Sequence, residues 1–442
     1  MSRDRLHLKA PDHWINDPNG FIYYQGNYHL FYQYFPYGTM WGTPHWGHAV
    51  SRDLVNWEHK GIALFPTKRG DQNGCFSGSA VEKDGRLYLV YTGVRYEEAD
   101  PENIHLCLNS RMESVQMMIS SADGFCFDNW NGKEVIIPPI TDKSIGDRTD
   151  TRDPKIWRGK DGWYYLILGS TREGKQGRVL FYQSRDLHTW TYVNQAAKGS
   201  AYGWMWECPD YFQTRGGQVL MLSAMGIRVG EGAVGNHTIC FPVEFREDNC
   251  ELKIPDDWQL MDYGLDLYAS QTAADEEGRA GMLAWLRMPE RDGDGRIGMF
   301  CSPRVAEVEG GHIYFRIHPN IRKVYSREIS APSQADPAGY MASFALEEGE
   351  EVDIGGFRIG RKGNRIYTDR SAVFPAGEDC RLASETPEVK KGFRVEALVD
   401  RNMVEVFVND GEYVITNAVY GLGHSVAGNG AGNIRLYTVE AE

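Results

Sequence analysis

The chain has 442 residues, of which 42% are hydrophobic and 24% charged, and this composition is typical of a folded globular protein rather than a disordered one. Its formal net charge of −14 at pH 7 argues against nucleic acid or an anionic membrane surface as the main partner. The longest apolar runs are far shorter than a membrane span, so the sequence predicts no membrane association.

The N-terminal segment and the cysteines bear on location. Residues 1–5 carry charges with no apolar stretch after them, so we expect no signal peptide. The eight cysteines are scattered without paired spacings, which is typical of free thiols in a reducing compartment. The sequence therefore predicts a cytoplasmic protein.

Five predicted β-hairpins follow one another through the first 300 residues. A second repeat, SRDLVNW at 51–57 and SRDLHTW at 184–190, interleaves with them, and 121–125 is a degenerate copy. The turn glycines of the hairpins are Gly26, Gly85, Gly162, Gly217 and Gly278. Units of about 60 residues without helical periodicity have room for four short strands each. The sequence therefore predicts an all-β fold, with a five-bladed β-propeller over residues 1–310.

The repeat ends at about residue 310. Residues 318–337 contain three prolines and mixed charges, so we expect a linker over 311–337, with one short helix near Ile321 to Tyr325. Beyond it, alternating strands and an Asn409-Asp410-Gly411 turn predict a C-terminal antiparallel β-sandwich over residues 338–442. A segment of that length is long enough to fold around its own core.

Three carboxylic acids hold matching places in the repeat. Asp17, Asp153 and Glu207 each precede their turn glycine by nine or ten residues (26 − 17, 162 − 153, 217 − 207). Because the innermost strand of every blade begins at the same end of the central channel, we expect the three side chains to meet at one mouth. Three carboxylates in one pocket suit either metal binding or glycosidic bond cleavage.

The sequence around each acid suggests a separate role in glycoside hydrolysis. Tryptophans flank Glu207, so we expect an apolar setting that raises its pKa and suits an acid/base. Amides and turn backbone surround Asp17, which we expect to stay ionised as a nucleophile. Arg152 precedes Asp153 and is expected to keep that carboxylate charged, so that it binds two sugar hydroxyls as oxocarbenium character develops.

Each motif taken alone has a plainer interpretation. Asn-Asp-Pro-Asn-Gly is a turn signal and Arg-Asp-Pro is usually a surface ion pair, so only their shared place in the repeat favours a site. His45 and His48 are three residues apart, but no helix presents them on one face and no third ligand is near, so we expect no metal. Cys208 is more typical of a buried thiol than of a nucleophile. No phosphate-binding glycine loop is present.

These motifs resemble those of glycoside hydrolase family 32, which contains invertases, inulinases and sucrose-6-phosphate hydrolases. Residues 14–20 (WINDPNG), 152–154 (RDP) and 206–210 (WECPD) are similar to its nucleophile, transition-state-stabiliser and acid/base motifs. Residues 76–80 and 266–271 match further signatures of the family. Residues 400–411 resemble its C-terminal sandwich, so the resemblance extends over nearly the whole chain.

The resemblance implies a retaining β-fructofuranosidase. Such an enzyme releases terminal β-D-fructose from sucrose, sucrose 6-phosphate or short fructo-oligosaccharides through a covalent fructosyl-enzyme. Retention places the carboxyl groups of Asp17 and Glu207 roughly 5–5.5 Å apart. No cofactor is implied. The residues implied to bind the sugar are Asn16, Gln33, Trp41, Phe76, Ser77, Arg152, Tyr268 and Trp285.

Several alternatives stay open at this point. A fructosyltransferase would use the same intermediate with a sugar hydroxyl in place of water, and a non-catalytic propeller would bind sugar only. A phosphate on the substrate is undecided. The sandwich is either a structural buttress or a homodimer contact. The cations that could reach a substrate phosphate from loops are Arg95, Lys143, Arg148, Arg172 and Lys175.

Overall fold

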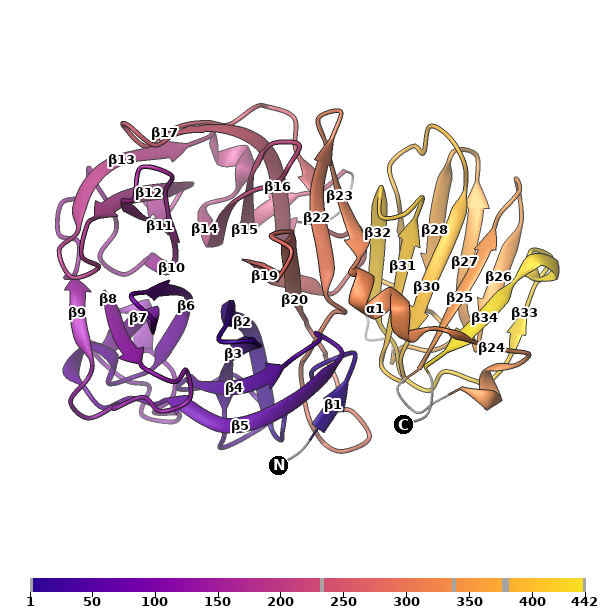
Figure 1. Ribbon diagram of the computed structural model, residues 1–442, viewed down its shortest axis with the longest axis horizontal. Helices are drawn as coiled ribbons and strands as arrows, with labels where there is room; N and C mark the ends of the chain where they lie inside the picture. Colours follow the sequence, from indigo (N-terminus) through magenta and orange to yellow (C-terminus); the bar gives the residue numbers. More distant parts are fainter. Residues whose placement is uncertain (1–2, 231–233, 336–338, 376–380, 440–442) are drawn as a thin grey trace.

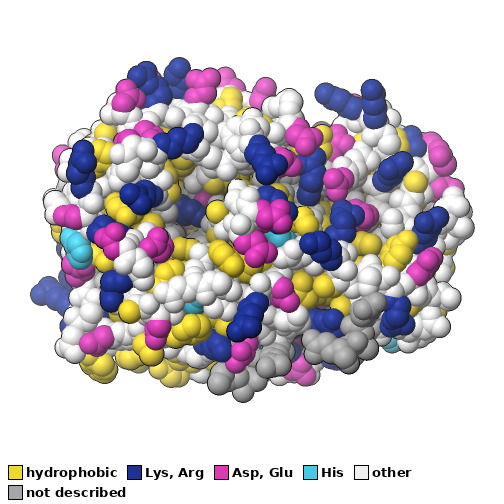
Figure 2. All heavy atoms as spheres, in the orientation of Figure 1, with side chains coloured by type: hydrophobic (Ala, Val, Ile, Leu, Met, Phe, Trp, Pro, Cys, Tyr) yellow, Lys and Arg dark blue, Asp and Glu magenta, His cyan; other side chains and the backbone are white. Residues whose placement is uncertain are grey.

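The computed structural model describes residues 3–230, 234–335, 339–375 and 381–439. Figure 1 shows a ring of sheets, coloured indigo to orange, beside a two-layered body coloured orange to yellow. Acidic and basic side chains are interspersed over the face shown in Figure 2, so the negative net charge is not gathered into one patch there. Among the described residues, no helix is long and apolar enough to cross a membrane.

The ring consists of five antiparallel sheets, each built from one continuous stretch of chain. The first contains β1 (Arg3–Arg5), β2 (Trp14–Tyr24), β3 (Asn27–Phe35), β4 (His45–Ser51) and β5 (Asn56–Leu64). The second contains β6 (Cys75–Lys83), β7 (Arg86–Tyr96), β8 (Met112–Ser121) and β9 (Glu134–Ile137). The third contains β10 (Thr151–Arg158), β11 (Tyr164–Arg172), β12 (Gln176–Ser184) and β13 (Thr191–Ala197). The fourth contains β14 (Met205–Gln213), β15 (Gln218–Arg228), β16 (Val234–Arg246), β17 (Glu251–Lys253) and β18 (Gln259–Leu260). The fifth contains β19 (Leu267–Ala274), β20 (Ala280–Leu286), β21 (Met299–Phe300), β22 (Arg304–Glu309) and β23 (His312–Ile317).

The innermost strands close the ring. Each of β2, β6, β10 and β14 contacts the innermost strand of the next sheet, and β19 contacts β2 again. The five expected hairpin turns join each innermost strand to the second strand of its sheet. The predicted all-β fold is therefore confirmed, and its first five sheets form the closed ring that the predicted five-bladed propeller requires (Figure 1).

Blade packing explains why these strands read as continuous apolar runs. All residues of β11 except the last are buried, because a neighbouring blade covers each face of the sheet. Close approach of backbones also requires glycine at two points, one between two blades and one within the second blade. A Cβ atom on Gly169 would lie 1.9 Å from the carbonyl oxygen of Trp206, and one on Gly78 would lie 2.0 Å from that of Val90. At Gly169 the third and fourth blades are therefore so close that no side chain fits between them.

The interleaved repeat forms one kind of turn after the third strand of a blade. The Asp53 carboxylate accepts hydrogen bonds from the Val55 and Asn56 backbone N–H groups, both at 2.8 Å. Asp123 and Asp186 make the same bonds in the second and third blades. Such Asx turns give the backbone a local partner where the strand ends.

The expected linker over 311–337 is too long. Its first part, β23, is the outermost strand of the fifth blade, and β24 (Arg327–Ile329) joins a sheet of the second domain, so the expected propeller end at 310 is also early. The alternation of buried and half-exposed residues in β23 is a strand signal over only six residues, and the nearby prolines and charges obscured it. The predicted short helix is confirmed as α1 (Pro319–Val324). The expected boundary at 337/338 lies outside the described residues.

The second domain is a sandwich of two antiparallel sheets with its own apolar core. One sheet contains β24 (Arg327–Ile329), β25 (Tyr340–Ala345), β30 (Arg394–Val399), β31 (Met403–Val408), β32 (Tyr413–Ala418) and β34 (Arg435–Thr438). The other contains β26 (Glu351–Ile354), β27 (Phe357–Lys362), β28 (Arg365–Asp369), β29 (Ala383–Glu385) and β33 (Val426–Ala427). A further apolar cluster includes Met282 and Phe315 of the fifth blade together with Phe407 and Val414 of the sandwich, so the two domains share buried surface.

The N-terminal segment ties three parts of the molecule together. Its backbone hydrogen-bonds the fifth blade, through Phe300 N–H to the Leu8 carbonyl at 2.9 Å and Ile15 N–H to the Ile297 carbonyl at 3.0 Å. The His7 ring contacts Asp400 at 3.0 Å and Glu405 at 2.9 Å, both in the sandwich. The segment therefore bridges the first blade, the last blade and the second domain.

A buried charge network continues from His7 between the domains. Arg304 of the fifth blade donates to Asp262 and to Glu405, both at 2.8 Å, and its side chain is fully buried. Burial lowers the pKa of His7, but hydrogen bonds to Asp400 and Glu405 and their charges raise it to about 9. The histidine is thus held as a cation between two carboxylates.

Candidate active site

Every innermost strand of the ring is interrupted by a β-bulge, and the expected site residues other than Gln33, Trp41 and Trp285 lie in these bulges or directly before them. The bulges fall between Ile15 and Pro18, Cys75 and Gly78, Arg152 and Lys155, Glu207 and Asp210, and Tyr268 and Ser270. A bulge adds a residue, bends the strand and re-aims a side chain. Asp153, Cys208 and Ala269 have positive φ angles of 63°, 43° and 47°, so the backbone is strained at three of these places.

Asp17 lies in the bulge of β2, where neighbouring side chains donate hydrogen bonds to its carboxylate. Ser77 of the second blade donates to Asp17 Oδ2 at 2.5 Å, and Asn16 donates to Oδ1 at 3.2 Å. Burial raises the pKa of Asp17, as does the charge of Glu207, while the bonds from Ser77 and Asn16 lower it; the net shift is upward. That amides and turn backbone keep Asp17 ionised stays a prediction: its donors are the side chains of Ser77 and Asn16, and burial beside a second acid acts against them.

A chain of amide and hydroxyl groups links the first two blades beside Asp17. Asn16 Nδ2 also donates to Gln33 Oε1 at 2.9 Å, and Gln33 Nε2 donates to Ser77 Oγ at 2.5 Å. The Trp14 indole donates to Asn16 Oδ1 at 2.9 Å. Asn16, Gln33 and Ser77 are almost fully buried, so this chain holds their polar groups fixed beside the carboxylate.

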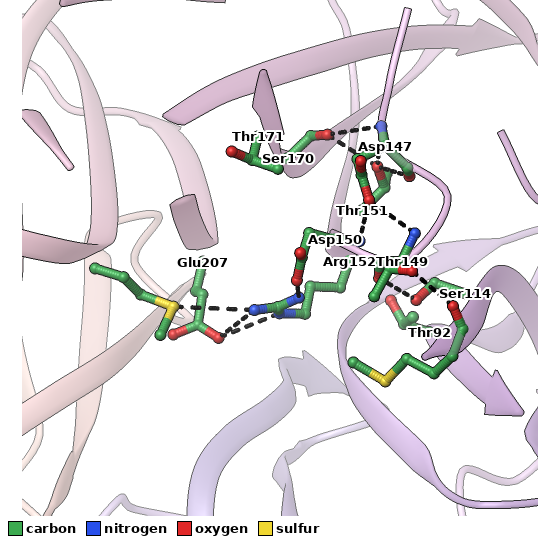
Figure 3. Close-up of polar contacts among 12 residues, drawn as sticks. Thr92, Ser114, Asp147, Thr149, Asp150, Thr151, Arg152, Ser170, Thr171 and Glu207 are labelled. Carbon is green, nitrogen blue, oxygen red and sulfur yellow. Dashed lines mark hydrogen bonds and ion pairs between the residues drawn. The ribbon is translucent and has the colours of Figure 1, made fainter. Parts of the chain in front are cut away.

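Glu207 accepts hydrogen bonds from two other blades. Arg152 donates to Glu207 Oε1 from Nε at 3.1 Å and from Nη2 at 3.0 Å, as Figure 3 shows. The Tyr268 hydroxyl of the fifth blade donates to Oε2 at 2.7 Å. The expected apolar setting is wrong: Trp206, the neighbour in sequence, is fully buried in the blade core, because successive side chains of a strand point to opposite faces.

Asp153 is fixed by backbone rather than by its neighbour Arg152. The Cys208 backbone N–H donates to Asp153 Oδ2 at 2.9 Å, and Thr92 Oγ1 accepts the Asp153 backbone N–H at 3.0 Å. Burial raises the pKa of Asp153 to about 7; the Arg152 charge lowers it, and the nearby carboxyl groups of Glu207 and Asp17 raise it further. The expectation that Arg152 keeps Asp153 at an ordinary acidic pKa is therefore wrong, since burial and the other acids outweigh the guanidinium.

The side chains of the three acids meet around Cys208. Its sulfur lies 3.6 Å from Asp17 Oδ2 and 3.7 Å from Asp153 Oδ2, and Glu207 precedes it in the chain. Burial raises the pKa of the Cys208 thiol well above its ordinary value, and the surrounding carboxylates raise it further. The thiol is thus a neutral spacer between acids from the first and third blades.

Of the four aromatic residues expected to bind sugar, Tyr268 bonds to Glu207, whereas Trp41, Phe76 and Trp285 lie at the edge of this polar group. The ring of Trp41 meets that of Phe76 edge to face at 5.7 Å, next to Ser77 in sequence. Trp285 packs edge to face on Trp14 at 5.9 Å, and Trp14 in turn donates to Asn16. The structure therefore places Trp41, Phe76 and Trp285 beside the partners of Asp17. Among the described contacts, none of these three rings bonds directly to an acid.

Sequence reasoning missed several residues that hold the acids. Cys208 and Thr92 fix Asp153, and Asp150 accepts a bond from Arg152 Nη1 at 2.8 Å. Met225 Sδ lies 3.9 Å from Arg152 Nη2. The position of Asp150, two residues before Arg152, was a usable signal because residues two apart share one face of a strand. Thr92 and Met225 come from other strands and left no local signal.

Comparison with known families accounts for this arrangement. The model described as "Glycosyl hydrolases family 32 N-terminal domain" matches residues 7–314, and "Glycosyl hydrolases family 32 C terminal" matches residues 312–441. The chain belongs to glycosyl hydrolases family 32. The family 32 chain is 31% identical to the raffinose invertase of Escherichia coli, over 94% of this chain and 89% of that one. It is 29% identical to the sucrose-6-phosphate hydrolase of Bacillus subtilis (strain 168), over 99% and 94%.

Solved structures of family 32 share the fold. The GH32 beta-fructofuranosidase BmSUC1 of Bombyx mori superposes with a TM-score of 0.82 at 28% identity, covering 98% of this chain and 93% of that one. The sucrose-6-phosphate hydrolase of Lactobacillus gasseri gives a TM-score of 0.84 at 23% identity, covering 99% and 93%. The match covers both the propeller and the sandwich.

Proposed function

We propose that this family 32 protein is a retaining β-fructofuranosidase that releases terminal β-D-fructose from sucrose, sucrose 6-phosphate or short fructo-oligosaccharides. One observation supports this most strongly: carboxyl groups from three different blades lie in one cluster, each held by donors from a neighbouring blade. Two carboxyl groups in distinct surroundings are what retaining glycoside hydrolysis requires.

In the first step Asp17 acts as the nucleophile. One of its oxygens bonds to the anomeric carbon C2 of the fructosyl unit while the bond from C2 to the leaving oxygen breaks. Glu207 gives its proton to that oxygen, which departs as a hydroxyl of the released sugar. In the second step Glu207 takes a proton from water, the water oxygen bonds to C2, and the ester to Asp17 breaks, so the configuration is retained.

The partners of Asp17 and Glu207 fit these roles. Ser77 and Asn16 donate to the Asp17 carboxylate, which offsets part of the effect of burial and favours the ionised form that attacks. Arg152 and Tyr268 hold both oxygens of Glu207 and fix its orientation toward the leaving group. No step of this chemistry needs a cofactor.

Asp153 acts as the transition-state stabiliser in this proposal. Its Oδ2 is fixed by the Cys208 backbone N–H, so the carboxylate is presented to the sugar in one orientation. Hydrogen bonds from two sugar hydroxyls to Asp153 strengthen as positive charge develops on the ring. Each such bond also favours the ionised form of a carboxyl group whose pKa is about 7.

The remaining expected residues form the fructose subsite. Asn16, Gln33 and Ser77 offer the hydrogen-bonding groups on the side of Asp17. Arg152 and Tyr268 do so on the side of Glu207. The aromatic rings of Trp41, Phe76 and Trp285 supply the apolar wall on which sugar C–H groups pack.

The substrate range is drawn from the relatives. Two of them are named raffinose invertase and sucrose-6-phosphate hydrolase, and a variant of the Bombyx mori enzyme was solved in complex with sucrose. A comparison of kcat/KM for sucrose, sucrose 6-phosphate, raffinose, 1-kestose and inulin identifies the preferred substrate.

Product analysis tests the proposal against its alternatives. The purified protein is incubated with sucrose, and glucose, fructose and oligosaccharides are separated by chromatography. A hydrolase gives equal glucose and fructose, and the first fructose released has the β configuration by NMR. Oligosaccharides with little free fructose at high sucrose would indicate the transferase. Binding without any product would indicate a sugar-binding propeller, and Asp17→Ala with undiminished fructose release would rule out the proposed nucleophile.

The cytoplasmic location and the homodimer contact stay predictions from the sequence.

A further inference from the structure

Arg152 divides its guanidinium between two carboxylates of different chemical character. Nε and Nη2 face Glu207, whereas Nη1 donates to Asp150 Oδ1 at 2.8 Å. The side chain of Arg152 is 10% exposed, so its charge is poorly solvated and depends on these partners. Figure 3 shows the guanidinium lying between the Asp150 and Glu207 side chains.

One of these two partners is not a constant anion. In the proposed function Glu207 gives up a proton in the first step and takes one back in the second, so it is neutral for part of each cycle. Asp150 takes no part in the bond changes. Of the two carboxylates hydrogen-bonded to Arg152, it is therefore the one whose charge the proposed cycle does not change.

Asp150 lies in a loop that is stabilised by hydrogen bonds among its own residues. The Asp147 carboxylate accepts the backbone N–H groups of Thr149 at 2.9 Å and Asp150 at 2.8 Å. Thr151 Oγ1 donates to the Asp147 carbonyl at 2.6 Å and shares a hydrogen bond with Ser170 of β11 at 2.9 Å (Figure 3). The turn before β10 therefore has little freedom to move.

The same loop is also hydrogen-bonded to the second blade. Ser114 of β8 donates to the Thr149 carbonyl at 2.7 Å, and Thr149 Oγ1 donates to the Met112 carbonyl at 2.8 Å. Neither bond involves the Asp150 side chain, which is directed to Arg152. These six side-chain hydrogen bonds fix the loop from which the Asp150 carboxylate reaches Arg152, which is the kind of support that precise catalytic geometry needs.

We propose that Asp150 is a positioning residue for the acid/base, which fixes the edge of Arg152 that faces Glu207 and balances the guanidinium charge while Glu207 is protonated. The inference rests on the proposed function. Without Asp150, Glu207 is the remaining carboxylate that accepts a hydrogen bond from Arg152, with the charge of Asp153 also nearby, so more of the guanidinium charge acts on Glu207 and opposes the return of its proton. The charged or titratable groups around Glu207 are Arg152, Tyr268, Asp17, Asp153 and Cys208.

Two variants separate the charge of Asp150 from its hydrogen bond. Asp150→Asn keeps an oxygen acceptor for Arg152 Nη1 but removes the charge, and Asp150→Ala removes both. We expect kcat for sucrose to fall about tenfold in the first and about a hundredfold in the second, with KM changed less than about threefold, because misplacing a catalytic group by about 1 Å costs on the order of a hundredfold. The alkaline limb of the pH–rate profile should move to lower pH in both variants, since the protonated acid is harder to regain.

A substrate with an activated leaving group distinguishes positioning of the acid from general damage. A p-nitrophenyl β-D-fructofuranoside needs little proton donation, so the loss in its rate should be much smaller than the loss for sucrose. Equal losses for both substrates, or an unmoved alkaline limb, would overturn the inference. Thermal midpoints of both variants are measured beside the kinetics, and Asp150→Asn is nearly isosteric, so folding is retained.

Asp248→Asn is the matched control. Asp248 accepts a bond from Arg246 Nη2 at 2.9 Å at an exposed place in the fourth blade, so this variant removes an Asp–Arg pair away from the site. It should keep the wild-type rate and pH profile. If the wild type releases no fructose from any fructoside, the proposed function fails and this inference fails with it. If the wild type is active and Asp150→Asn and Asp150→Ala behave as wild type, only this inference fails.

Discussion

The backbone N–H of Cys208 donates to the Asp153 carboxylate at 2.9 Å, which joins the fourth blade to the third directly at the site. Because Cys208 follows Glu207 in the chain, this bond also fixes the spacing between the stabilising carboxylate and the acid/base. A backbone donor has no rotamer freedom, so the spacing depends on how the two blades pack. Both residues have positive φ angles, and the strain is located where this contact is made.

Replacing Asp153 should stabilise the fold while abolishing activity. Its pKa is raised from 3.8 to about 7, so its contribution to stability is fully present below pH 3.8 and is lost as the pH rises through about 7. The amide side chain that replaces Asp153 in the variant does not titrate. The free energy of unfolding of Asp153→Asn should therefore exceed that of the wild type, by on the order of 4 kcal/mol at pH 8 and by almost nothing at pH 4. Urea unfolding at the two pH values measures the difference.

The activity of Asp153→Asn should fall by at least about a hundredfold, because an amide cannot strengthen its bonds to sugar hydroxyls as charge develops. A variant that is equally stable at both pH values would show that the buried carboxyl group does not carry the shifted pKa.

The buried His7 cation should make stability fall at alkaline pH. Since its pKa is raised from 6.5 to about 9, its contribution is fully present below pH 6.5 and is lost as the pH rises through about 9, roughly 3 kcal/mol in all. His7→Gln removes the cation between Asp400 and Glu405 and should destabilise the protein by roughly 3–5 kcal/mol at pH 6. Thermal midpoints between pH 6 and pH 10 should drop for the wild type and stay flatter for the variant.

His13→Gln is the control for this experiment. His13 lies in the same N-terminal segment, and its side chain is 42% exposed and contacts the exposed Asp12. Its loss should leave the pH dependence of the midpoint unchanged. A parallel drop in both variants would place the alkaline sensitivity elsewhere in the protein.

Gly169→Ala should displace the strand that carries Glu207. The added methyl group would lie 1.9 Å from the Trp206 carbonyl oxygen, so β14 must move away from β11. We expect both a lower thermal midpoint and a kcat reduced by about a hundredfold, since Glu207 is the next residue. Gly199→Ala is matched to it, because nothing lies within 4 Å of its Cβ position, and it should have neither effect.

Ser77→Ala should move the acid limb of the pH–rate profile. The Ser77 hydroxyl donates to Asp17 and lowers its pKa, so its removal should raise that pKa and shift the acid limb of kcat/KM to higher pH. A hydrogen bond to a charged group is worth about 1.5–3 kcal/mol, which corresponds to roughly a tenfold to hundredfold loss in rate.

Ser121→Ala provides the comparison, because Ser121 is a buried serine in the second blade that donates to Asp123 instead. It should lower stability without moving the acid limb. An unmoved limb in Ser77→Ala would mean that the serine does not tune the nucleophile.

Local sequence signals were enough to predict the architecture of the ring. The turn glycines and the repeated Ser-x-Asp turns are short-range features, and the phase of Asp17, Asp153 and Glu207 within the repeat predicted three acids in matching strands. The overlooked strand β23 shows the limit of this approach, since six residues of alternation were hidden by neighbouring prolines and charges.

The surroundings of each acid could not be predicted, because they come from other blades. Trp206 adjoins Glu207 in sequence but faces the blade core, while Tyr268, 61 residues away, donates to the carboxylate. Arg152 adjoins Asp153 but bonds to Glu207. In this ring the contacts of a site residue come from neighbouring blades. Residues adjacent in sequence point to the opposite face of the strand, so they do not predict those contacts.

The bridging N-terminal segment has a consequence for biosynthesis. Residues 7–15 leave the ribosome long before their partners at 297–300 and at Asp400 and Glu405 are made. The first blades can form as they are translated, but the contacts of residues 7–15 that close the ring cannot form until residues 297–405 have emerged. Closure is therefore a late event of high contact order, and ribosome-bound intermediates should keep residues 7–15 accessible to proteases until then.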